Sequence, residues 1–382
     1  MQMAKSILAG TFLLIGAVPQ GFAQERLEDT VNAVIQPLMK QQDIAGMAVA
    51  ITQDGKRHFF NYGVASKDTK ATVTDQTLFE IGSVSKTFTA TLGAYAQARG
   101  KLSLADPAGR HAPELQGSAL EHASLLNLAT YTPGGLPLQF PDDADRPDRM
   151  FGYFKTWKQL YPAGTQRLYS NPSIGLFGYL AARSLGQPFD EAMEKVLMPA
   201  LGLKHGYLHV PAQQSGRYAQ GYAKDGKPVR VGPGALDSEA YGVKISSSDL
   251  IRFVEANLHP EKLGADLQQA IGTTHTGFYQ VGGMTQGLGW EFYPYPVSLE
   301  QLLAGNSPQM ALTPQKATLL QPPRPAPDNA WINKTGSTGG FGAYVAFVPG
   351  RDMGIVLLAN KNYPIEERVK VAHRILTALD SQ

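Results

Sequence analysis

The stretch Phe79-Glu80-Ile81-Gly82-Ser83-Val84-Ser85-Lys86-Thr87-Phe88 predicts an extended segment that enters a helix at Gly82 or Ser83. Residues three apart on a helix share a face, so the amine of Lys86 is expected near the hydroxyl of Ser83. The unpaired N–H groups and the macrodipole of a helix N-terminus favour negative charge at that serine. A serine hydroxyl is a poor nucleophile unless a neighbouring base takes its proton, and a lysine does so only when burial or cations lower its pKa. The stretch therefore predicts an activated serine nucleophile.

A single Ser-x-x-Lys motif has an alternative interpretation. A chain of this length contains about one such motif by chance. The serine would then cap a helix beside a solvated lysine. The nucleophile becomes the better interpretation only if other parts of the chain supply the groups that the chemistry needs.

Composition bounds the class of protein. The 382 residues are 43% hydrophobic and 17% charged, which predicts a globular chain with a large core in two lobes. A formal net charge of +2, without any basic run, does not favour a nucleic-acid partner. The chain has no cysteine, which excludes disulfides, thiolate metal ligands and a cysteine nucleophile.

The N-terminus has the pattern of a secretory signal peptide over residues 1–23. Lys5 precedes an apolar run over residues 7–18, and Gly21 and Ala23 place small residues before a cut after Ala23. The run is too short to cross a bilayer, and no other segment is apolar enough to do so. We expect a soluble mature protein in the periplasm or outside the cell, without membrane contact; the alternative is a buried N-terminal helix.

Hydrophobic periodicity predicts strands and helices at both ends of the chain. Helices are expected at 27–38, 83–100, 173–185, 247–258 and 365–379, and strands at 47–53, 57–64, 331–335, 344–348 and 353–359. Residues 102–162 are expected to form short helical and loop pieces, residues 206–242 a long surface excursion, and residues 321–327 an extended connector.

These elements predict an α+β fold with an antiparallel sheet flanked by helices and a second, all-helical domain. The expected α/β domain is built from both termini, by residues 24–82 and part of 166–382. The expected helical domain comprises residues 83–165 and part of 240–300. The functional site is expected between the two.

Two further stretches supply partners for Ser83. Tyr169-Ser170-Asn171 precedes a helix, and a tyrosine becomes a useful base only if nearby ammonium groups lower its pKa far below 10. Lys334-Thr335-Gly336-Ser337 lies on a strand that we expect at a sheet edge, and its lysine would be the second ammonium group. Gly336 permits close approach, and the N–H of Ser337 joins that of Ser83 in an oxyanion hole. Singly, these stretches are also compatible with a packed ring beside an N-cap and with an exposed turn.

Taken together, the three motifs resemble those of class C serine β-lactamases, the cephalosporinases of the penicillin-recognising serine hydrolase superfamily. The likeness extends over Phe79–Ala90, Tyr169–Gly178, Glu239–Ile245 and Lys334–Pro364. The resemblance implies a β-lactamase/transpeptidase-like fold and hydrolysis of the β-lactam ring amide, with cephalosporins preferred, through a serine acyl-enzyme. It also implies β-lactam resistance, a small-molecule β-lactam as the only partner, a monomer, and no metal or cofactor.

The resemblance also implies roles for individual residues. Ser83 would form the acyl-enzyme, Lys86 and Tyr169 would share the proton transfers, and Tyr169 would activate the deacylating water. Which of the two accepts the serine proton stays open. The substrate-binding residues implied are Gln139 and Asn171 for the side-chain amide, Lys334, Thr335, Gly336 and Ser337 for the carboxylate and ring, Tyr241 for the far wall, and Asn362 near the carboxylate. Ile365 departs from an asparagine that many members carry, which bears on carboxylate recognition.

Other functions compete with this interpretation. A D,D-peptidase or an esterase of the same superfamily would use the same serine and lysine, but such peptidases often have Ser-x-Asn where this chain has Tyr169-Ser170-Asn171. A penicillin-binding sensor would be acylated without turnover. A metallo-hydrolase is disfavoured, because His205 and His209 are the only histidines at short spacing and no acidic cluster accompanies them.

Overall fold

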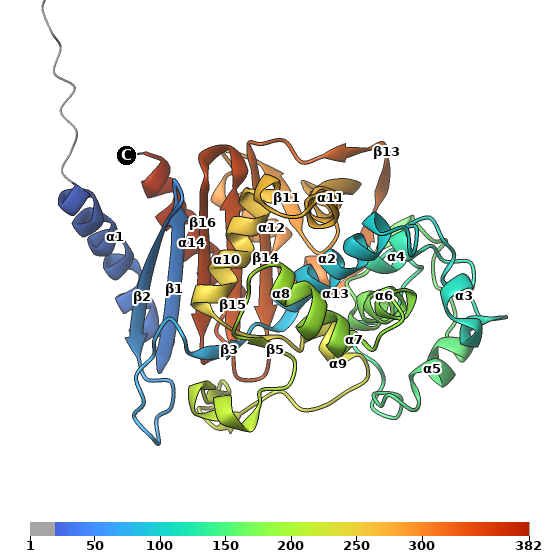
Figure 1. Cartoon of the computed structure of the whole chain (residues 1–382), viewed down its shortest axis with the longest axis horizontal. Helices are drawn as coiled ribbons and strands as arrows, with labels where there is room; N and C mark the ends of the chain where they lie inside the picture. The colour runs from blue at the N-terminus through green and yellow to red at the C-terminus, as the bar shows by residue number, and fades with distance from the viewer. Residues whose placement is uncertain (1–19, 382) are drawn as a thin grey trace, which may run out of the picture.

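The computed structural model describes residues 20–381, and a nine-stranded antiparallel sheet organises the fold (Figure 1). The strand order is β13-β9-β10-β11-β14-β15-β16-β1-β2. The strands are β1 (Gly46–Gln53), β2 (Lys56–Gly63), β9 (Thr276–Val281), β10 (Met284–Gln286), β11 (Glu291–Pro294), β13 (Thr318–Pro325), β14 (Ala330–Ser337), β15 (Gly342–Val348) and β16 (Met353–Ala359). All eight neighbouring pairs are antiparallel. Both ends of the chain therefore contribute to one sheet.

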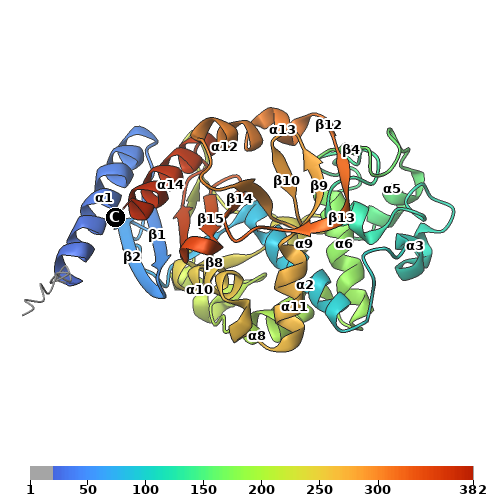
Figure 2. The ribbon, with the colours of Figure 1, turned by 90° about the horizontal axis from the view of Figure 1, so that it is seen from above.

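Helices cover both faces of this sheet (Figure 2). Alternate residues of a strand point to opposite faces, so Tyr344 and Ala346 of β15 pack in the same core cluster as helices α1 (Gln20–Gln41) and α14 (Ile365–Asp380). Val345 and Phe347 pack instead with α10 (Ser247–Leu258) on the other face. Because both faces are covered, β15 and β16 are buried throughout and are almost continuously apolar.

A helical region lies beside the sheet, around helix α2 (Ser85–Ala98). Helices α6 (Asn171–Ser184), α9 (Asp237–Tyr241) and α11 (Ala265–Thr274) all contact α2. A Cβ at Gly93 would lie 2.2 Å from Cζ of Phe177, and one at Gly178 would lie 2.6 Å from Cγ2 of Thr89. These two glycines let α2 and α6 approach closely. The remaining helices are α3 (Ala108–His111), α4 (Leu125–Ala129), α5 (Met150–Thr156), α7 (Phe189–Glu191), α8 (Met198–Ala200), α12 (Leu299–Gly305) and α13 (Pro308–Leu312).

Shorter strands complete the framework. Strand β8 (Lys244–Ser246) pairs with β3 (Leu78–Glu80) and β5 (Gly206–Tyr207), β4 (Gln166–Arg167) pairs with β12 (Gln315–Lys316), and β6 (Gly221–Tyr222) pairs with β7 (Pro228–Val229). The pairing of β3 with β8 fixes the segment that leads into Ser83.

The α+β fold and all the helices and strands expected at the two ends of the chain are confirmed, within a few residues at their boundaries. Two expectations were wrong. Strand β14 is not at a sheet edge, because β11 pairs with its first half, Ala330–Asn333, and β15 with its other side. The expected connector 321–327 lies mostly within β13, which pairs with β9 as the edge strand.

The expected surface excursion 206–242 is only partly at the surface. Its first part carries short strands, but Ala235, Leu236 and Glu239 are buried. A Cβ at Gly175 of α6 would lie 2.7 Å from Cβ of Leu236, so the segment packs directly on that helix. This inward course brings α9 beside α2.

The predicted signal peptide lies almost entirely outside the described residues, and only its last four positions, 20–23, belong to α1. Within residues 20–381, no helix combines the length and the apolar character needed to cross a membrane.

Candidate active site

Ser83 lies on a single 3₁₀ turn, Gly82–Val84, between β3 and α2. Gly82 has a φ of +50°, and a Cβ there would lie 2.5 Å from the backbone nitrogen of Ser337. A Cβ at Gly336 would lie 2.0 Å from the carbonyl oxygen of Ile81 and 3.0 Å from the nitrogen of Ser83. Two glycines thus let the turn and strand β14 cross in direct backbone contact, which brings the N–H groups of Ser83 and Ser337 close together.

Lys86 lies one turn after Ser83, on the first turn of α2. Its side chain is completely buried, and Nζ is 2.9 Å from Oγ of Ser83 and 2.7 Å from the carbonyl oxygen of Ala240, to which it donates. Burial, with help from the positive charge of Lys334, lowers the pKa of Lys86 to about 8. The lysine can therefore lose its proton near neutral pH.

Tyr169 is held by the N-terminus of α6. Ser170 caps that helix by accepting a hydrogen bond from the N–H of Ser173. The centre of the Tyr169 ring lies 5.0 Å from Nζ of Lys334 and 5.2 Å from Nζ of Lys86. Burial raises the pKa of Tyr169, but these two ammonium groups outweigh it, and its pKa falls to about 8. Its hydroxyl makes no standard hydrogen bond within residues 20–381.

Lys334 lies on β14 just past the end of β11, whose first residue, Glu291, is opposite Asn333. From Lys334 to Ser337 the strand therefore pairs on one side only, and its other side faces the pocket. This is why a motif within an interior strand is still accessible to a ligand.

Two buried charged side chains next to Lys334, Arg167 and Glu291, were not predicted from the sequence. Nη2 of Arg167 is 3.0 Å from Oε1 of Glu291, and the same oxygen lies 3.9 Å from Nζ of Lys334. Nε of Arg167 also donates to Oε1 of Gln286 at 2.7 Å. Arg167 stands two residues before Tyr169, which was an available signal. Glu291 lies in no recognisable motif, so only the paired strands place it here.

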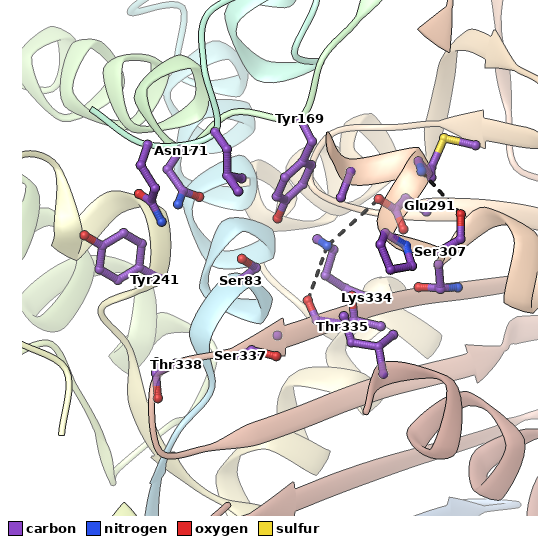
Figure 3. Close-up of a pocket in the computed structure, with 18 of the residues that line it drawn as sticks. Ser83, Tyr169, Asn171, Tyr241, Glu291, Ser307, Lys334, Thr335, Ser337 and Thr338 are labelled. Atoms are coloured by element: carbon purple, nitrogen blue, oxygen red, sulfur yellow. Dashed lines mark hydrogen bonds and ion pairs between the residues drawn. The ribbon is translucent and has the colours of Figure 1, made fainter. Parts of the chain in front are cut away.

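Nine of the eleven predicted residues line one pocket of about 430 Å³, within the range of small-molecule sites. Figure 3 shows Asn171 and Tyr241 on one side of Ser83 and Lys334 and Thr335 on the other, with Tyr169 above. The predicted residues that line it are Ser83, Gln139, Tyr169, Asn171, Tyr241, Lys334, Thr335, Gly336 and Ser337. Lys86 does not line the pocket but contacts Ser83 from within the protein.

Asn362 does not line this pocket. Its Oδ1 accepts a hydrogen bond from Nη2 of Arg368 at 3.1 Å, and Nη1 of Arg368 donates to Oγ of Ser337 at 2.9 Å. Ile365 does line the pocket, with an apolar side chain. Among residues 20–381, Arg368 is therefore what links Asn362 to the pocket by hydrogen bonds.

Within the part of the chain that the structure describes, no group of three or more histidine and acidic side chains is arranged to hold a metal ion. The groups nearest the nucleophile are the hydroxyl of Ser83, the phenol of Tyr169, the amines of Lys86 and Lys334, and the backbone N–H groups of Ser83 and Ser337. These groups suit nucleophilic attack on a carbonyl carbon, with stabilisation of the oxyanion that forms.

A serine, a lysine one turn later and a tyrosine between two amines define an active-site serine hydrolase. A family model described as Beta-lactamase matches residues 31–380, and the chain therefore belongs to the β-lactamase family.

Individual relatives are similar over nearly their whole length. The chain is 62% identical over 354 residues to a β-lactamase of Pseudomonas fluorescens, covering 93% of this chain and 99% of that protein. It is 51% identical to a solved β-lactamase/D-alanine carboxypeptidase from Pseudomonas syringae, with a TM-score of 0.90 over 92% of this chain and 99% of that one. A class C β-lactamase solved in complex with cefoxitin is 52% identical, with a TM-score of 0.90 over 93% and 99%. The resemblance inferred from the motifs is confirmed.

Proposed function

We propose that this chain hydrolyses the ring amide of β-lactams, with cephalosporins preferred, through an ester at Ser83, and thereby confers β-lactam resistance. The observation that carries the proposal is the position of Tyr169 between two amines, with one of these amines 2.9 Å from the serine hydroxyl.

Acylation follows from this geometry. Oγ of Ser83 bonds to the lactam carbonyl carbon, and its proton passes to the Lys86–Tyr169 pair. The N–H groups of Ser83 and Ser337 donate hydrogen bonds to the oxyanion. The close backbone contact at Gly82 and Gly336 brings these two groups together. The ring C–N bond then breaks, and the ring nitrogen takes a proton from the pair.

Deacylation reverses the proton movements. Water adds to the ester carbonyl while Tyr169 accepts its proton, and Oγ of Ser83 leaves with a proton returned by the pair. The products are the ring-opened acid and the free enzyme. Because the pKa values of Lys86 and Tyr169 are both lowered to about 8, the pair can hold either one or two protons close to neutral pH.

Substrate contacts follow the two sides of the pocket. Lys334, Thr335 and Ser337 offer an ammonium group and two hydroxyls to the substrate carboxylate and ring. We assign the substrate's side-chain amide to Asn171, which lies on the side of Tyr241, and to Gln139, which also lines the pocket. Asn362 supports the carboxylate side through Arg368, and Ile365 supplies an apolar surface there.

A D-alanine carboxypeptidase activity is the second candidate. The solved relatives from Pseudomonas syringae and Burkholderia cenocepacia both carry that activity in their names. A peptide ending in D-Ala-D-Ala presents a similar carboxylate and carbonyl to the same serine.

One experiment separates these functions. Steady-state rates are measured with a penicillin, a cephalosporin and a D-Ala-D-Ala peptide, and intact mass is recorded after mixing with a slowly hydrolysed cephalosporin. Rapid turnover of the cephalosporin with a transient adduct at Ser83 supports the lactamase. A stable adduct without turnover would indicate a sensor, and faster peptide hydrolysis would indicate a carboxypeptidase.

We further propose a monomer that acts in the periplasm after residues 1–23 are removed, and two domains divided as expected from the sequence. The pocket lies where β14 meets the helical region of α2 and α6, which supports a site between domains. N-terminal sequencing of the secreted protein tests the cut after Ala23, and size-exclusion chromatography with light scattering tests the monomer.

A further inference from the structure

One wall of the pocket depends on an irregular segment. The wall loop, defined here as residues 230–236, joins β7 to α9 without helix or strand. Val231 lines the pocket from this loop, and Tyr241 lines it from the helix that follows. No N–H group of residues 231–236 donates to a backbone carbonyl elsewhere in residues 20–381. Regular backbone pairing therefore does not fix residues 231–236 of this loop, whereas Tyr241 belongs to helix α9.

Two carboxylates from distant parts of the chain hold the wall loop instead. Oε1 of Glu80 accepts a hydrogen bond from the N–H of Val231 at 3.0 Å. Oδ1 of Asp145 accepts one from the N–H of Ala235 at 2.7 Å. Hydrogen bonds to charged acceptors are about twice as strong as neutral ones, so these two contacts are strong attachments for the N–H groups of residues 231–236.

The attachment at Glu80 is part of the core. Glu80 is 1% exposed, and its Oε1 accepts hydrogen bonds from both the hydroxyl of Tyr218 and the N–H of Val231. Arg230 covers the Tyr218 ring at 3.9 Å and donates to the Tyr218 carbonyl oxygen at 2.8 Å. Because Glu80 also ends the strand before Ser83, its removal would disturb the nucleophile as well as the loop.

The attachment at Asp145 is separate from the catalytic groups. Asp145 is partly exposed and lies in the loop before α5. A Cβ at Gly234 would lie 2.9 Å from Oδ1 of Asp145 and 3.1 Å from the hydroxyl of Tyr241, so this glycine leaves room for both side chains. Asp145 is thus packed against the part of the wall loop that leads into Tyr241.

We propose that Asp145 is a positioning residue that determines how the pocket accepts large acyl side chains. Its carboxylate fixes the end of the wall loop, and the loop fixes Val231 and Tyr241 against the substrate side chain. The inference rests on the proposed function, because it concerns the side of the pocket assigned there to the side-chain amide. Substrates without an acyl side chain do not use this wall and do not depend on Asp145.

The test compares Asp145→Ala with Asp145→Asn, whose amide oxygen still accepts the hydrogen bond. We expect Asp145→Ala to raise KM about tenfold for a cephalosporin with a bulky acylamino group and to change it less than twofold for 6-aminopenicillanic acid, which has none. Asp145→Asn should restore most of the difference. Asp143→Ala, at an exposed acidic residue of the same loop, should leave both substrates unaffected. Equal losses for both substrates would overturn the proposal.

A measurement that does not use turnover separates this proposal from the proposed function. Amide hydrogen exchange in peptides over residues 230–241 should accelerate in Asp145→Ala but not in Asp143→Ala. Unchanged exchange would refute the attachment, whatever the activity. Faster exchange in a protein that hydrolyses no β-lactam would keep the attachment and refute the proposed function, and with it the role in β-lactam selection.

Discussion

The crossing of the nucleophile turn and strand β14 makes Gly336→Ala the most informative single substitution. The new Cβ would lie 2.0 Å from the carbonyl oxygen of Ile81, 2.8 Å from the nitrogen of Val84 and 3.0 Å from that of Ser83. All three are backbone atoms, so no side-chain rotation relieves the contact. A carbon–oxygen contact of normal length requires the strand to retreat by about 1 Å or more.

The expected loss of activity follows from the displacement of Ser337, which would move together with Gly336. Ser337 carries one of the two N–H groups of the proposed oxyanion hole and is the next residue along the strand. Loss of one such donor costs roughly 10²–10³ in kcat, and a 1 Å misplacement costs on the order of 10². We therefore expect kcat/KM of Gly336→Ala to fall by about 10²–10³, equivalent to about 2.7–4 kcal/mol of transition-state stabilisation.

The assay is nitrocefin hydrolysis by protein whose folding is checked by circular dichroism. Gly339→Ala is the matched control, because its Cβ would meet only Val229, at 3.6 Å, which is ordinary contact. A folded Gly336→Ala enzyme with activity within threefold of the parent would refute the argument that this crossing forms the oxyanion hole.

Three further predictions concern the titrating groups and the nucleophile. Ser83→Ala should lose about 10⁴-fold or more in kcat, because the catalytic groups act as a unit, and EDTA should leave the activity of the parent unchanged. A nitrocefin assay in which Ser83→Ala stays active and EDTA abolishes activity would exclude the mechanism. Because the pKa values of Lys86 and Tyr169 are lowered to about 8, kcat/KM should rise with pH as one proton leaves the pair and should level off above about pH 8. Tyr169→Phe should change the shape of this pH profile as well as the rate. A pH profile identical to that of the parent would contradict the role of Tyr169. Burial raises the pKa of Glu239 from 4.5 to about 8, so the folded state holds a proton that the unfolded state releases, and stability should fall as pH rises from about 4.5 to 8. The parent should lose on the order of 3 kcal/mol relative to Glu239→Gln between pH 4.5 and 7 in urea unfolding, and parallel curves for the two proteins would show that Glu239 ionises freely.

The sequence predicted the elements that carry strong local signals. The hairpin of β1 and β2, the three C-terminal strands and helix α10 were placed from periodicity and turn residues, because each buries a regular apolar face. The position of β14 within the sheet was predicted wrongly. Its neighbour β11 is only four residues long, which is too short for a clear periodic pattern, so there was no basis in the sequence for expecting that pairing.

The site was predicted in the same uneven way. The motif residues Ser83, Lys86, Tyr169 and Lys334 converge as expected. They could be identified because each lies in a short, recognisable sequence motif. The attachments of Asp145 and Glu80 and the ion pair of Arg167 with Glu291 were not foreseen. These contacts join residues more than eighty positions apart and depend on side-chain packing, which no single-sequence pattern records.

The outer edge of the large sheet has a consequence for the protein at high concentration. Three of the eight residues of β13 are proline, which has no N–H, and the register with β9 shifts between Leu319 and Arg324. An exposed edge strand with a full row of donors would invite a second molecule to extend the sheet and would begin aggregation. The interrupted β13 edge therefore offers a second chain few hydrogen bonds, so strand-to-strand association of crowded molecules is disfavoured at this edge.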